Sequence, residues 1–419
     1  MECYARHLDM SIRCERANTR LQVARIPNIS YLCKDDLDKR KAISVTACVL
    51  IAPDKFKGTL SAKEVADALG AGLAAKTDVR IIPLADGGDG SLDAVAAAGF
   101  DVVELDSAIK SATSMPARIA RKGDVFFVES AEFCGLRPVS GTLDPLGAST
   151  LGIGQAVRAA MDLGARTVVL GVGGTASTDG GVGFLMGLGA KFFTETGETI
   201  PLGGGGLFIL AKVDFTGLDP RLADTDMILA SDVESPLLGP SGAAKLFSPQ
   251  KGADPLQVEV LELGLIRLVK VLKSGTKFWT ERNRIASEAP GSGAGGGLGF
   301  AALLVGAIRV SGADYILDLL EIDEVLAECD LVLTGEGALD AQSLAGKLPV
   351  ALASRARALN IPVFAVVGRC DLSADECLAE GISQVYALDK MNPACANNPD
   401  LSLKLLTQIG SEIANSLPI

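Results

Sequence analysis

The sequence predicts an α/β protein with two domains. Its 419 residues exceed the size of one ordinary domain. Runs typical of buried strands alternate with helical patterns, and polar, glycine-rich segments follow the strands. Hydrophobic residues make up 48% of the chain and 47 residues are glycine, whereas only 5% are aromatic. This composition suits cores of Ala, Val, Leu and Ile with many tight loops.

The regular pattern begins near residue 45. Residues 45–52 read VTACVLIA, a run typical of a buried strand. Ser61 and Glu64 form a capping box that opens a helix to about residue 75. A second strand is expected at 79–83 and a helix at 91–98. This is the βαβ order of a parallel sheet, in which ligands bind at the carboxyl ends of the strands.

The same order returns near the C-terminus, and the middle of the chain is less regular. Further strands are expected at 330–334, 361–367, 117–121, 125–129 and 167–170, and helices at 149–163 and 256–273. We therefore predict a Rossmann-like parallel-sheet domain built from both chain ends, residues 45–105 plus 285–419. A second α/β domain, residues 106–284, is inserted between them. Residues 1–44 mix charges without periodicity, which predicts a disordered or non-native extension.

Composition excludes several classes of function. The net charge of −12 disfavours a nucleic-acid partner. No apolar run reaches eighteen residues, so no membrane span is expected. Nine cysteines without a C-x-x-C predict reduced thiols and a cytoplasmic protein. The only histidine is His7, which disfavours a Ser-His-Asp mechanism or a His-based metal site, so any general base is a carboxylate or a perturbed lysine.

Three glycine-rich stretches could hold an anion. Residues 171–181 follow a predicted strand and match G-x-G-x-x-A, so a phosphate cradle, a dinucleotide loop and a simple turn all stay open. Residues 291–299 contain G-x-G-x-x-G without a preceding strand. They predict either a phosphate site before a helix at 298–308 or a hinge. Residues 239–252 carry Lys245 and Lys251, for which composition favours solvated surface positions over phosphate contacts.

Two further patterns narrow the chemistry. A fourth glycine run, Gly203–Gly206, predicts a turn or flexible loop. A Walker A motif and the protein-kinase motifs are absent from the sequence. Acidic residues recur at strand ends, where they suit Mg²⁺-assisted phosphoryl transfer: Asp54, Asp86, Asp89, Glu129, Asp179, Asp232, Glu336 and Asp340.

Six sequence blocks together resemble the type I glycerate kinases. They occur in family order at 51–62 (IAPDKFKGTLSA), 85–90, 171–183, 231–253, 290–299 and 333–349. The resemblance implies ATP-dependent phosphorylation of D-glycerate with Mg²⁺, and 2-phosphoglycerate rather than 3-phosphoglycerate as the product. It also implies two α/β domains that face a cleft. The chain departs from the family pattern at Leu151, at Ala338, where a basic residue is common, and at Glu132-Phe133, where small residues are usual.

On this resemblance we expect glycerate and ATP to meet between the domains. Asp179, or another loop carboxylate, is expected to take the hydroxyl proton, because the glycines around it allow close approach. The other predicted catalytic residues are Lys57 and Asp54. The predicted Mg²⁺ ligands are Asp232, Glu336 and Asp340. Predicted substrate- and ATP-binding residues are Asp86, Gly87, Gly88, Gly173, Gly174, Thr175, Lys251, Gly293, Gly295, Gln342, Ser343 and Lys347.

Three alternatives remain. The spacing of residues 171–176 suits an NAD-dependent dehydrogenase. The departures from the family pattern suit a kinase of another small hydroxy acid, or a non-catalytic regulatory binder of such acids. The sequence does not determine the oligomeric state, and a homodimer is among the options.

Overall fold

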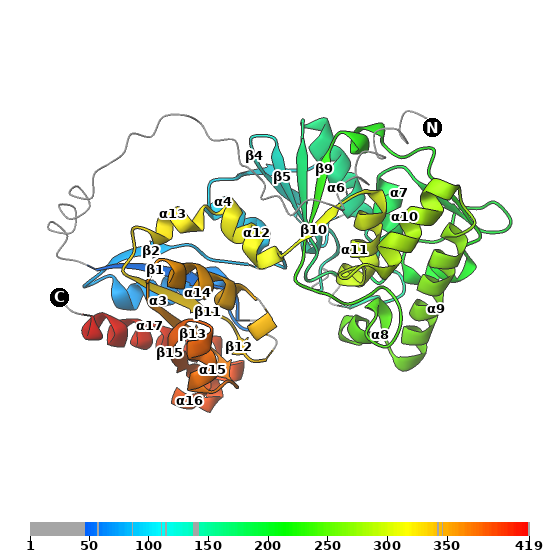
Figure 1. Cartoon of the computed structure of the whole chain (residues 1–419). Helices are drawn as coiled ribbons and strands as arrows, with labels where there is room; N and C mark the ends of the chain where they lie inside the picture. The colour runs from blue at the N-terminus through cyan, green and yellow to red at the C-terminus, as the bar shows by residue number, and fades with distance from the viewer. Residues whose placement is uncertain are drawn as a thin grey trace.

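The computed structural model describes residues 47–417 apart from positions 57, 86, 110, 114, 137–141, 342 and 346. Two sheets with helices on their faces make up the protein, with the first and last parts of the chain side by side (Figure 1). The mixed α/β fold with parallel sheets is thus confirmed. The predicted extension at 1–44 lies outside the described residues. None of the helices described is both long and apolar enough to cross a membrane.

The first sheet has five parallel strands in the order β15-β13-β11-β1-β2. The strands are β1 (Cys48–Pro53), β2 (Asp78–Ile81), β11 (Leu331–Gly335), β13 (Val363–Val367) and β15 (Ile382–Ala387). Alternate side chains of a strand point to opposite faces. Val49 and Ile51 therefore pack against α3 (Ala62–Leu73) and α17 (Pro399–Ser416), whereas Leu50 and Ala52 belong to the core on the opposite face.

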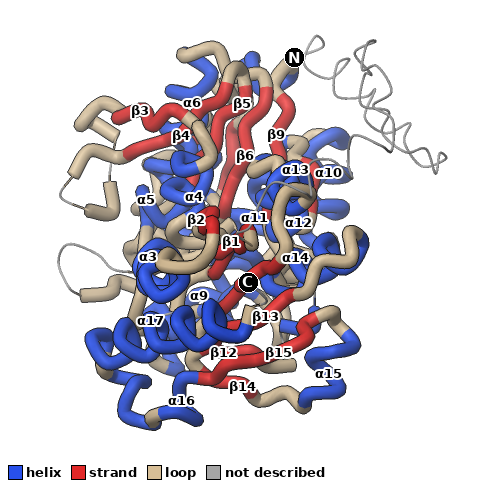
Figure 2. Tube along the Cα trace, turned by 90° about the vertical axis from the view of Figure 1, so that its left-hand side faces the viewer, coloured by secondary structure: helices blue, strands red, loops and turns tan. Residues whose placement is uncertain are grey.

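The second sheet has six strands in the order β10-β9-β6-β5-β4-β3. They are β3 (Asp101–Glu104), β4 (Arg118–Lys122), β5 (Val125–Glu129), β6 (Thr167–Gly171), β9 (Asp226–Ala230) and β10 (Ile308–Val310). Strands β5, β6, β9 and β10 are parallel, and β3 and β4 form an antiparallel edge. Figure 2 shows the two sheets as separate groups of strands.

The helices divide between the two sheets. On one face of the second sheet, Val168 and Leu170 share a core with α6 (Leu151–Asp162), α7 (Val182–Gly187), α9 (Pro255–Leu272) and α11 (Ala294–Val305). Val169 faces the opposite way and joins a core that also contains Leu50 of β1, so one apolar cluster connects both sheets. Helices α4 (Ser91–Ala97) and α12 (Gly312–Leu319) contribute to this connecting core (Figure 1).

The remaining elements are short or peripheral. They are α5 (Ser130–Cys134), β7 (Lys191–Phe193), η2 (Gly204–Ile209), β8 (Lys212–Asp214), η3 (Pro220–Ala223), α8 (Ala243–Phe247), η4 (Pro249–Lys251), α10 (Lys277–Glu288), α13 (Ile322–Leu326), β12 (Ala338–Leu339), η5 (Ser343–Ala345), α14 (Leu348–Ala358), β14 (Arg369–Cys370), α15 (Ala374–Ala379), α16 (Leu388–Met391) and η6 (Pro393–Asn397). The run Gly203–Gly206 is not a flexible loop, because most of it lies within η2. A Cβ on Gly204 would lie 2.3 Å from the carbonyl oxygen of Thr178.

Strand pairing bears on the proposed domain ranges. Strand β3 lies before residue 106 and β10 lies after residue 284, yet both pair within the six-stranded sheet. The second sheet thus extends beyond the range 106–284 at both ends. The division of the chain into two domains stays a prediction, and the pairing would shift its boundaries to about residues 100 and 311.

Candidate active site

A cavity of about 1170 Å³ lies where the strands of both sheets end. From the five-stranded sheet it is lined by Asp54 after β1, Gly88 after β2 and Glu336 after β11. From the six-stranded sheet it is lined by Glu129 at the end of β5 and Gly173 after β6. The carboxyl edges of two parallel sheets therefore face one space, which is the usual location of ligand sites in such sheets.

Glycine lets the two sheets approach closely here. The N–H of Gly173 donates to the carbonyl oxygen of Gly87 over 3.2 Å, which joins a loop of one sheet to a loop of the other. A Cβ on Gly173 would lie 2.5 Å from the Cα of Gly88, and a Cβ on Gly87 would lie 2.9 Å from the carbonyl oxygen of Ala230. No larger residue fits at these positions without displacing backbone.

The structure brings many of the predicted site residues to this cavity. Those on its wall are Asp54, Gly88, Gly173, Gly174, Glu336, Asp340 and Lys347. Thr175 is buried just behind the wall, where its hydroxyl donates to the carbonyl of Val172 over 2.8 Å. Ser343 is also buried, and its Oγ accepts the N–H of Asp340 over 3.2 Å, which holds the loop after β12. Lys57, Asp86 and Gln342 lie outside the described residues.

Among the described residues of the cavity wall, acidic side chains outnumber basic ones. The carboxylates are those of Asp54, Asp89, Glu129, Glu132, Glu336, Asp340 and Asp389, and the cations are those of Lys55, Lys347 and Arg369. An anionic ligand in such a cavity needs a divalent cation beside it, and carboxylate oxygens are the ligands that Mg²⁺ prefers. Within the described part of the chain, no three His, Cys, Asp or Glu residues gather closely enough to hold a metal ion by themselves.

Of the three predicted metal ligands, Asp232 is the one that is not on the cavity wall. Its two carboxylate oxygens accept the N–H groups of Gly312 and Ala313 over 2.8 and 3.0 Å, at the start of α12. In this structure its carboxylate binds the N-terminus of α12, where a negative charge is favourable.

Asp179 and Lys251 are two buried charged residues behind the cavity wall, close enough for their charges to interact although they form no ion pair. Only 1% of Asp179 and 3% of Lys251 is exposed. The Lys251 Nζ donates to the carbonyl oxygen of Ser177 over 2.5 Å. Burial lowers the pKa of Lys251 to about 8, and the charges of Cys134 and Asp179 oppose this shift. The expectation that Lys251 is a solvated surface lysine is therefore wrong, whereas Lys245 is exposed.

The Asp179 carboxylate accepts hydrogen bonds from the starts of two helices, α6 and α7. It accepts the N–H and the hydroxyl of Thr150, each over 2.9 Å, at the start of α6. It also accepts the N–H groups of Gly181 and Gly183 over 3.0 and 3.2 Å, at the start of α7. Burial raises the pKa of Asp179, and these hydrogen bonds oppose that rise. Asp179 does not line the cavity, although Gly173 and Gly174 of the same loop do.

A glycine turn at the start of α11 covers Asp179 and Lys251. Gly295, Gly296 and Gly297 have φ values of 58°, 70° and 94°, so the regular helix begins at Leu298, as predicted. A Cβ on Gly296 would lie 2.0 Å from the carbonyl oxygen of Ser177 and 2.9 Å from the Lys251 Nζ. Gly293 precedes this turn, and its N–H donates to the carbonyl oxygen of Ser235 over 2.9 Å.

Two neighbouring residues beside Lys251 carry buried hydroxyl groups. The Oγ of Ser177, whose carbonyl oxygen accepts a hydrogen bond from the Lys251 ammonium, and the Oγ1 of Thr178 have no hydrogen-bond partner among the described residues. Buried polar groups are normally satisfied, so an unpaired hydroxyl beside a buried ammonium indicates a place for a polar ligand or water. We call the buried region made up of Asp179, Lys251, Ser177, Thr178 and Gly295–Gly297 the lysine chamber.

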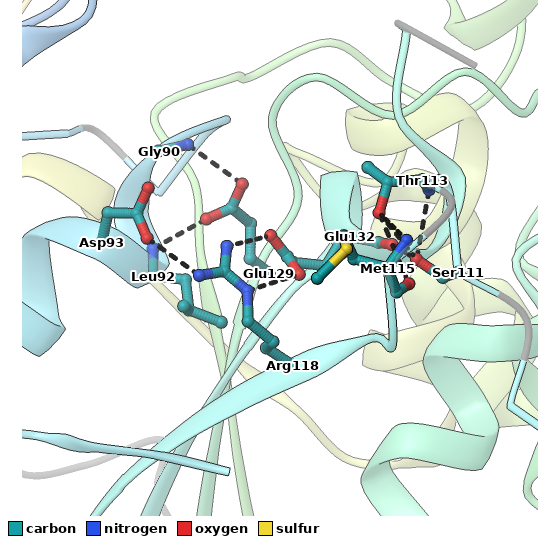
Figure 3. Close-up of polar contacts among 9 residues, drawn as sticks. All are labelled: Gly90, Leu92, Asp93, Ser111, Thr113, Met115, Arg118, Glu129 and Glu132. Atoms are coloured by element: carbon teal, nitrogen blue, oxygen red, sulfur yellow. Dashed lines mark hydrogen bonds and ion pairs between the residues drawn. The ribbon is translucent and has the colours of Figure 1, made fainter. Parts of the chain in front are cut away.

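A second acidic centre lies on the wall beside α4. The two oxygens of Glu129 accept the N–H groups of Gly90 and Leu92 over 3.0 and 2.7 Å, and burial raises the pKa of Glu129 to about 7. Arg118 reaches Glu132 over 2.7 Å and Asp93 over 3.3 Å (Figure 3). The pKa of Arg118 is raised by its hydrogen bond to Glu132.

The sequence predicts only part of this centre. Glu129 is one of the strand-end carboxylates expected to suit phosphoryl transfer, but no sequence pattern indicates its two backbone partners. Arg118 belongs to the antiparallel strand β4, so its approach to Glu132 depends on a pairing that spacing does not reveal. Around this ion pair, the carbonyl oxygen of Glu132 accepts the N–H of Ala112 and, over 3.4 Å, the hydroxyl of Ser111. These bonds hold a segment that also lines the cavity, and Figure 3 shows Ser111 and Thr113 of this segment.

Comparison with known proteins decides the family. The model of the glycerate kinase family matches residues 49–417. The chain belongs to the glycerate kinase family. The resemblance carried by the six sequence blocks is thereby confirmed, as is the assignment of the chain as a glycerate kinase enzyme.

Individual members of the glycerate kinase family align over most of the chain. Glycerate 2-kinase of Escherichia coli K12 is 34% identical over 348 residues, which cover 81% of this chain and 90% of that protein. Glycerate kinase of Bacillus subtilis 168 is 33% identical over 352 residues, with the same coverage. A crystal structure from Salmonella typhimurium LT2, described as glycerate kinase 2, superposes with a TM-score of 0.70 and 31% identity and covers 88% of this chain and 98% of its own.

Proposed function

We propose that this glycerate kinase transfers the γ-phosphoryl group of ATP to D-glycerate in the cavity between the two sheets, and that the product is 2-phosphoglycerate. One observation carries the proposal: strand-end carboxylates and lysines from both sheets line a single cavity of about 1170 Å³. Phosphoryl transfer depends on positioning and on charge neutralisation, and a cavity of this size accommodates ATP together with a three-carbon acid.

The cavity wall fits a nucleotide-bound Mg²⁺. Glu336 and Asp340 both line the cavity and would hold the ion. Mg²⁺ usually takes one or two carboxylates and completes its shell with phosphate oxygens and water, so a preformed cluster of three ligands is not required. When bound, the ion neutralises charge on the phosphates. A Mg²⁺ at Asp232 would have to compete with two backbone N–H groups for the carboxylate. We therefore place the ion at Glu336 and Asp340 and not at Asp232.

The lysine chamber supports a subsite for an anionic group, either the carboxylate of glycerate or a phosphate of ATP. This region contains the Lys251 ammonium, the unpaired hydroxyls of Ser177 and Thr178, and the backbone of Gly295–Gly297. Gln250, which precedes Lys251, lines the cavity, so the chamber adjoins it. Because Lys251 is buried, an anion reaches it only if the glycine segments of the wall move, which their lack of side chains permits.

A carboxylate takes the proton of the attacking hydroxyl. A general base must come within hydrogen-bond distance of that proton. Asp54 lines the cavity, whereas Asp179 is buried and satisfied by hydrogen bonds. We therefore place Asp54 as the base and Asp179 as a positioning residue that holds α6 and α7. Asp54→Asn should reduce kcat with little change in stability, whereas Asp179→Asn should affect both.

A coupled assay of ADP release tests the proposal. ADP release should depend on D-glycerate, and Lys347→Met, which removes a cation from the cavity wall, should lower kcat/KM. Lys63→Met is the control, because Lys63 is exposed on α3 and pairs with Asp67. ATP hydrolysis at the same rate with and without D-glycerate would contradict the proposal. The family match gives no support to the dehydrogenase alternative, and titration with NAD should show no binding.

A kinase of another small hydroxy acid is the second candidate. Ala338 and Glu132, two of the departures from the family pattern, both line the cavity. At position 338 the chain lacks a positive charge that is common in the family, and Glu132 adds a carboxylate where small residues are usual. Both differences change the charge that a substrate meets. Higher kcat/KM for a different hydroxy acid than for D-glycerate would favour this candidate.

A further inference from the structure

Helix α9 has apolar residues on its outer face as well as its inner face. Its inner face packs in the core of the second sheet through Leu261, Leu265 and Leu268. On the outer face Leu256 is 75% exposed, Leu263 50% and Ile266 43%. A surface helix normally presents a polar outer face, so this helix has a surface suited to a partner.

Neighbouring elements extend this apolar surface on both sides of the helix. On one side, Arg267 donates to the carbonyl oxygen of Leu210, which places the exposed Phe208 and Ile209 of η2 beside α9. On the other side, Lys245 of α8 lies 3.5 Å from Glu259, which places the exposed Leu246 beside α9. We call Phe208, Ile209, Leu246, Leu256, Leu263 and Ile266 the α9 patch.

The spacing along the outer face is that of a helix-pairing seam. Leu256, Leu263 and Lys270 follow each other at intervals of seven residues, and so do Glu259, Ile266 and Lys273. These two sets are the a and d positions of a heptad, which face a partner helix. Glu259, Lys270 and Lys273 are all exposed, with the acid toward the N-terminus and the bases toward the C-terminus.

This distribution is complementary to itself under a two-fold rotation. In an antiparallel pair centred between Leu263 and Ile266, Leu263 faces the partner's Ile266. Glu259 then faces the partner's Lys270, and Leu256 faces the stem of the partner's Lys273. The four apolar side chains at the centre, Leu263 and Ile266 of each helix, are thus flanked by two symmetric ion pairs. A patch that complements itself in this way fits a second copy of the same chain better than an unrelated protein.

We propose that the chain forms a homodimer in which two α9 patches meet and the two α9 helices run antiparallel. No residue of α8, α9 or η2 is on the wall of the cavity. Figure 1 places α9 at the outer edge of the molecule, away from the strands that end at the cavity. Each protomer therefore keeps its own complete active site, and loss of the dimer should leave turnover nearly unchanged.

Charge reversal across the seam tests the dimer. Glu259→Lys and Lys270→Glu each replace two attractive pairs per dimer by two repulsive ones. Exposed pairs contribute roughly 0.2–1 kcal/mol each, so either variant should raise the dimer dissociation constant roughly 10- to 100-fold. The double variant Glu259→Lys/Lys270→Glu restores attraction with reversed polarity and should regain the dimer. Sedimentation velocity over a concentration series reports the dissociation constant.

The controls separate assembly from folding. Asp67→Lys removes an exposed ion pair of α3, Lys63–Asp67, outside the patch and should leave the dimer unchanged. Leu263→Asp places a charge at the centre of the seam and should give a monomer of 43.2 kDa with an unchanged circular dichroism spectrum and unchanged kcat. A wild-type protein that stays monomeric at every concentration, or a double variant no better than the single variants, would overturn the proposal.

Discussion

Replacing Lys251 by methionine should make the unliganded protein more stable and the enzyme much less active. Lys251 is an ammonium group buried in the protein interior, where one hydrogen bond, to the carbonyl oxygen of Ser177, holds it. Methionine keeps the length and the apolar stem of the side chain and removes its charge. The variant therefore separates the cost of burying the charge from the benefit that the charge brings when an anion binds.

The pKa of Lys251 sets the size of the effect. Burial lowers it from 10.5 to about 8, and 2.5 units at 1.36 kcal/mol each give a cost of about 3 kcal/mol at pH 7. Methionine leaves the Ser177 carbonyl without its donor, which costs about 1 kcal/mol. Lys251→Met should thus raise the free energy of unfolding by about 2 kcal/mol at pH 7.

The pH dependence has a defined sign. The folded protein binds the Lys251 proton more weakly than the unfolded chain, so the cost is fully present below pH 8 and falls as the pH rises from about 8 to 10.5. The advantage of the variant over wild type should shrink across that range. A bound anion should restore the charge on Lys251, so ligand binding above pH 8 should be accompanied by proton uptake.

Urea unfolding of the unliganded protein and initial-rate kinetics test both parts. Lys245→Met is the matched control, because Lys245 is exposed and should change stability by less than about 0.5 kcal/mol. The reasoning is refuted if Lys251→Met is destabilised by more than 1 kcal/mol or keeps wild-type kcat/KM. An increase in KM for one substrate alone would tell whether the chamber holds the carboxylate of glycerate or a phosphate of ATP.

Three further variants test two buried carboxylates, Asp179 and Glu129, and the glycine turn at Gly296. Asp179→Asn replaces one acceptor oxygen by a donor beside the N–H groups at the starts of α6 and α7. It should lower the free energy of unfolding by about 1–3 kcal/mol, measured in urea; an unchanged value would contradict the positioning role. Glu129 has its pKa raised from 4.5 to about 7, so wild type should lose about 3 kcal/mol of stability between pH 4.5 and 7 relative to Glu129→Gln. Parallel pH–stability curves would contradict this. Gly296→Ala places a Cβ against the Ser177 carbonyl at positive φ and should impair folding or ligand binding far more than Gly239→Ala, which also has positive φ but open space around it; equal effects would remove the close-approach argument.

Local patterns were sufficient to predict seven strands of the two sheets and the cavity edge, but not β3, β9, β10 and β15. The apolar run at β1, the capping box at Ser61 and the loops after β6 and β11 depend on nearby residues, and the structure has each of them close to its expected position. Because parallel strands bring their carboxyl ends to one edge, Asp54, Gly88 and Glu336 of the five-stranded sheet could be expected in one place.

The remaining features depend on contacts between residues far apart in the sequence, which local patterns do not reveal. The burial of Lys251 depends on the loop Gly295–Gly297 closing over it, which its own neighbours in sequence do not indicate. Gly203–Gly206 resembles a flexible loop by composition, but η2 packs tightly against the Thr178 backbone. Asp232 carries the acidic character expected of a metal ligand, yet its partners come from α12, about eighty residues further along the chain.

Phosphorus NMR of a reaction mixture with ATP, D-glycerate and this enzyme tests the central claim most directly. We predict that a phosphate-ester resonance on the C2 hydroxyl of glycerate appears in step with ADP, and that Lys347→Met suppresses both signals together. If ADP and inorganic phosphate accumulate with no glycerate ester, the cavity between the sheets does not transfer phosphoryl groups to this acid.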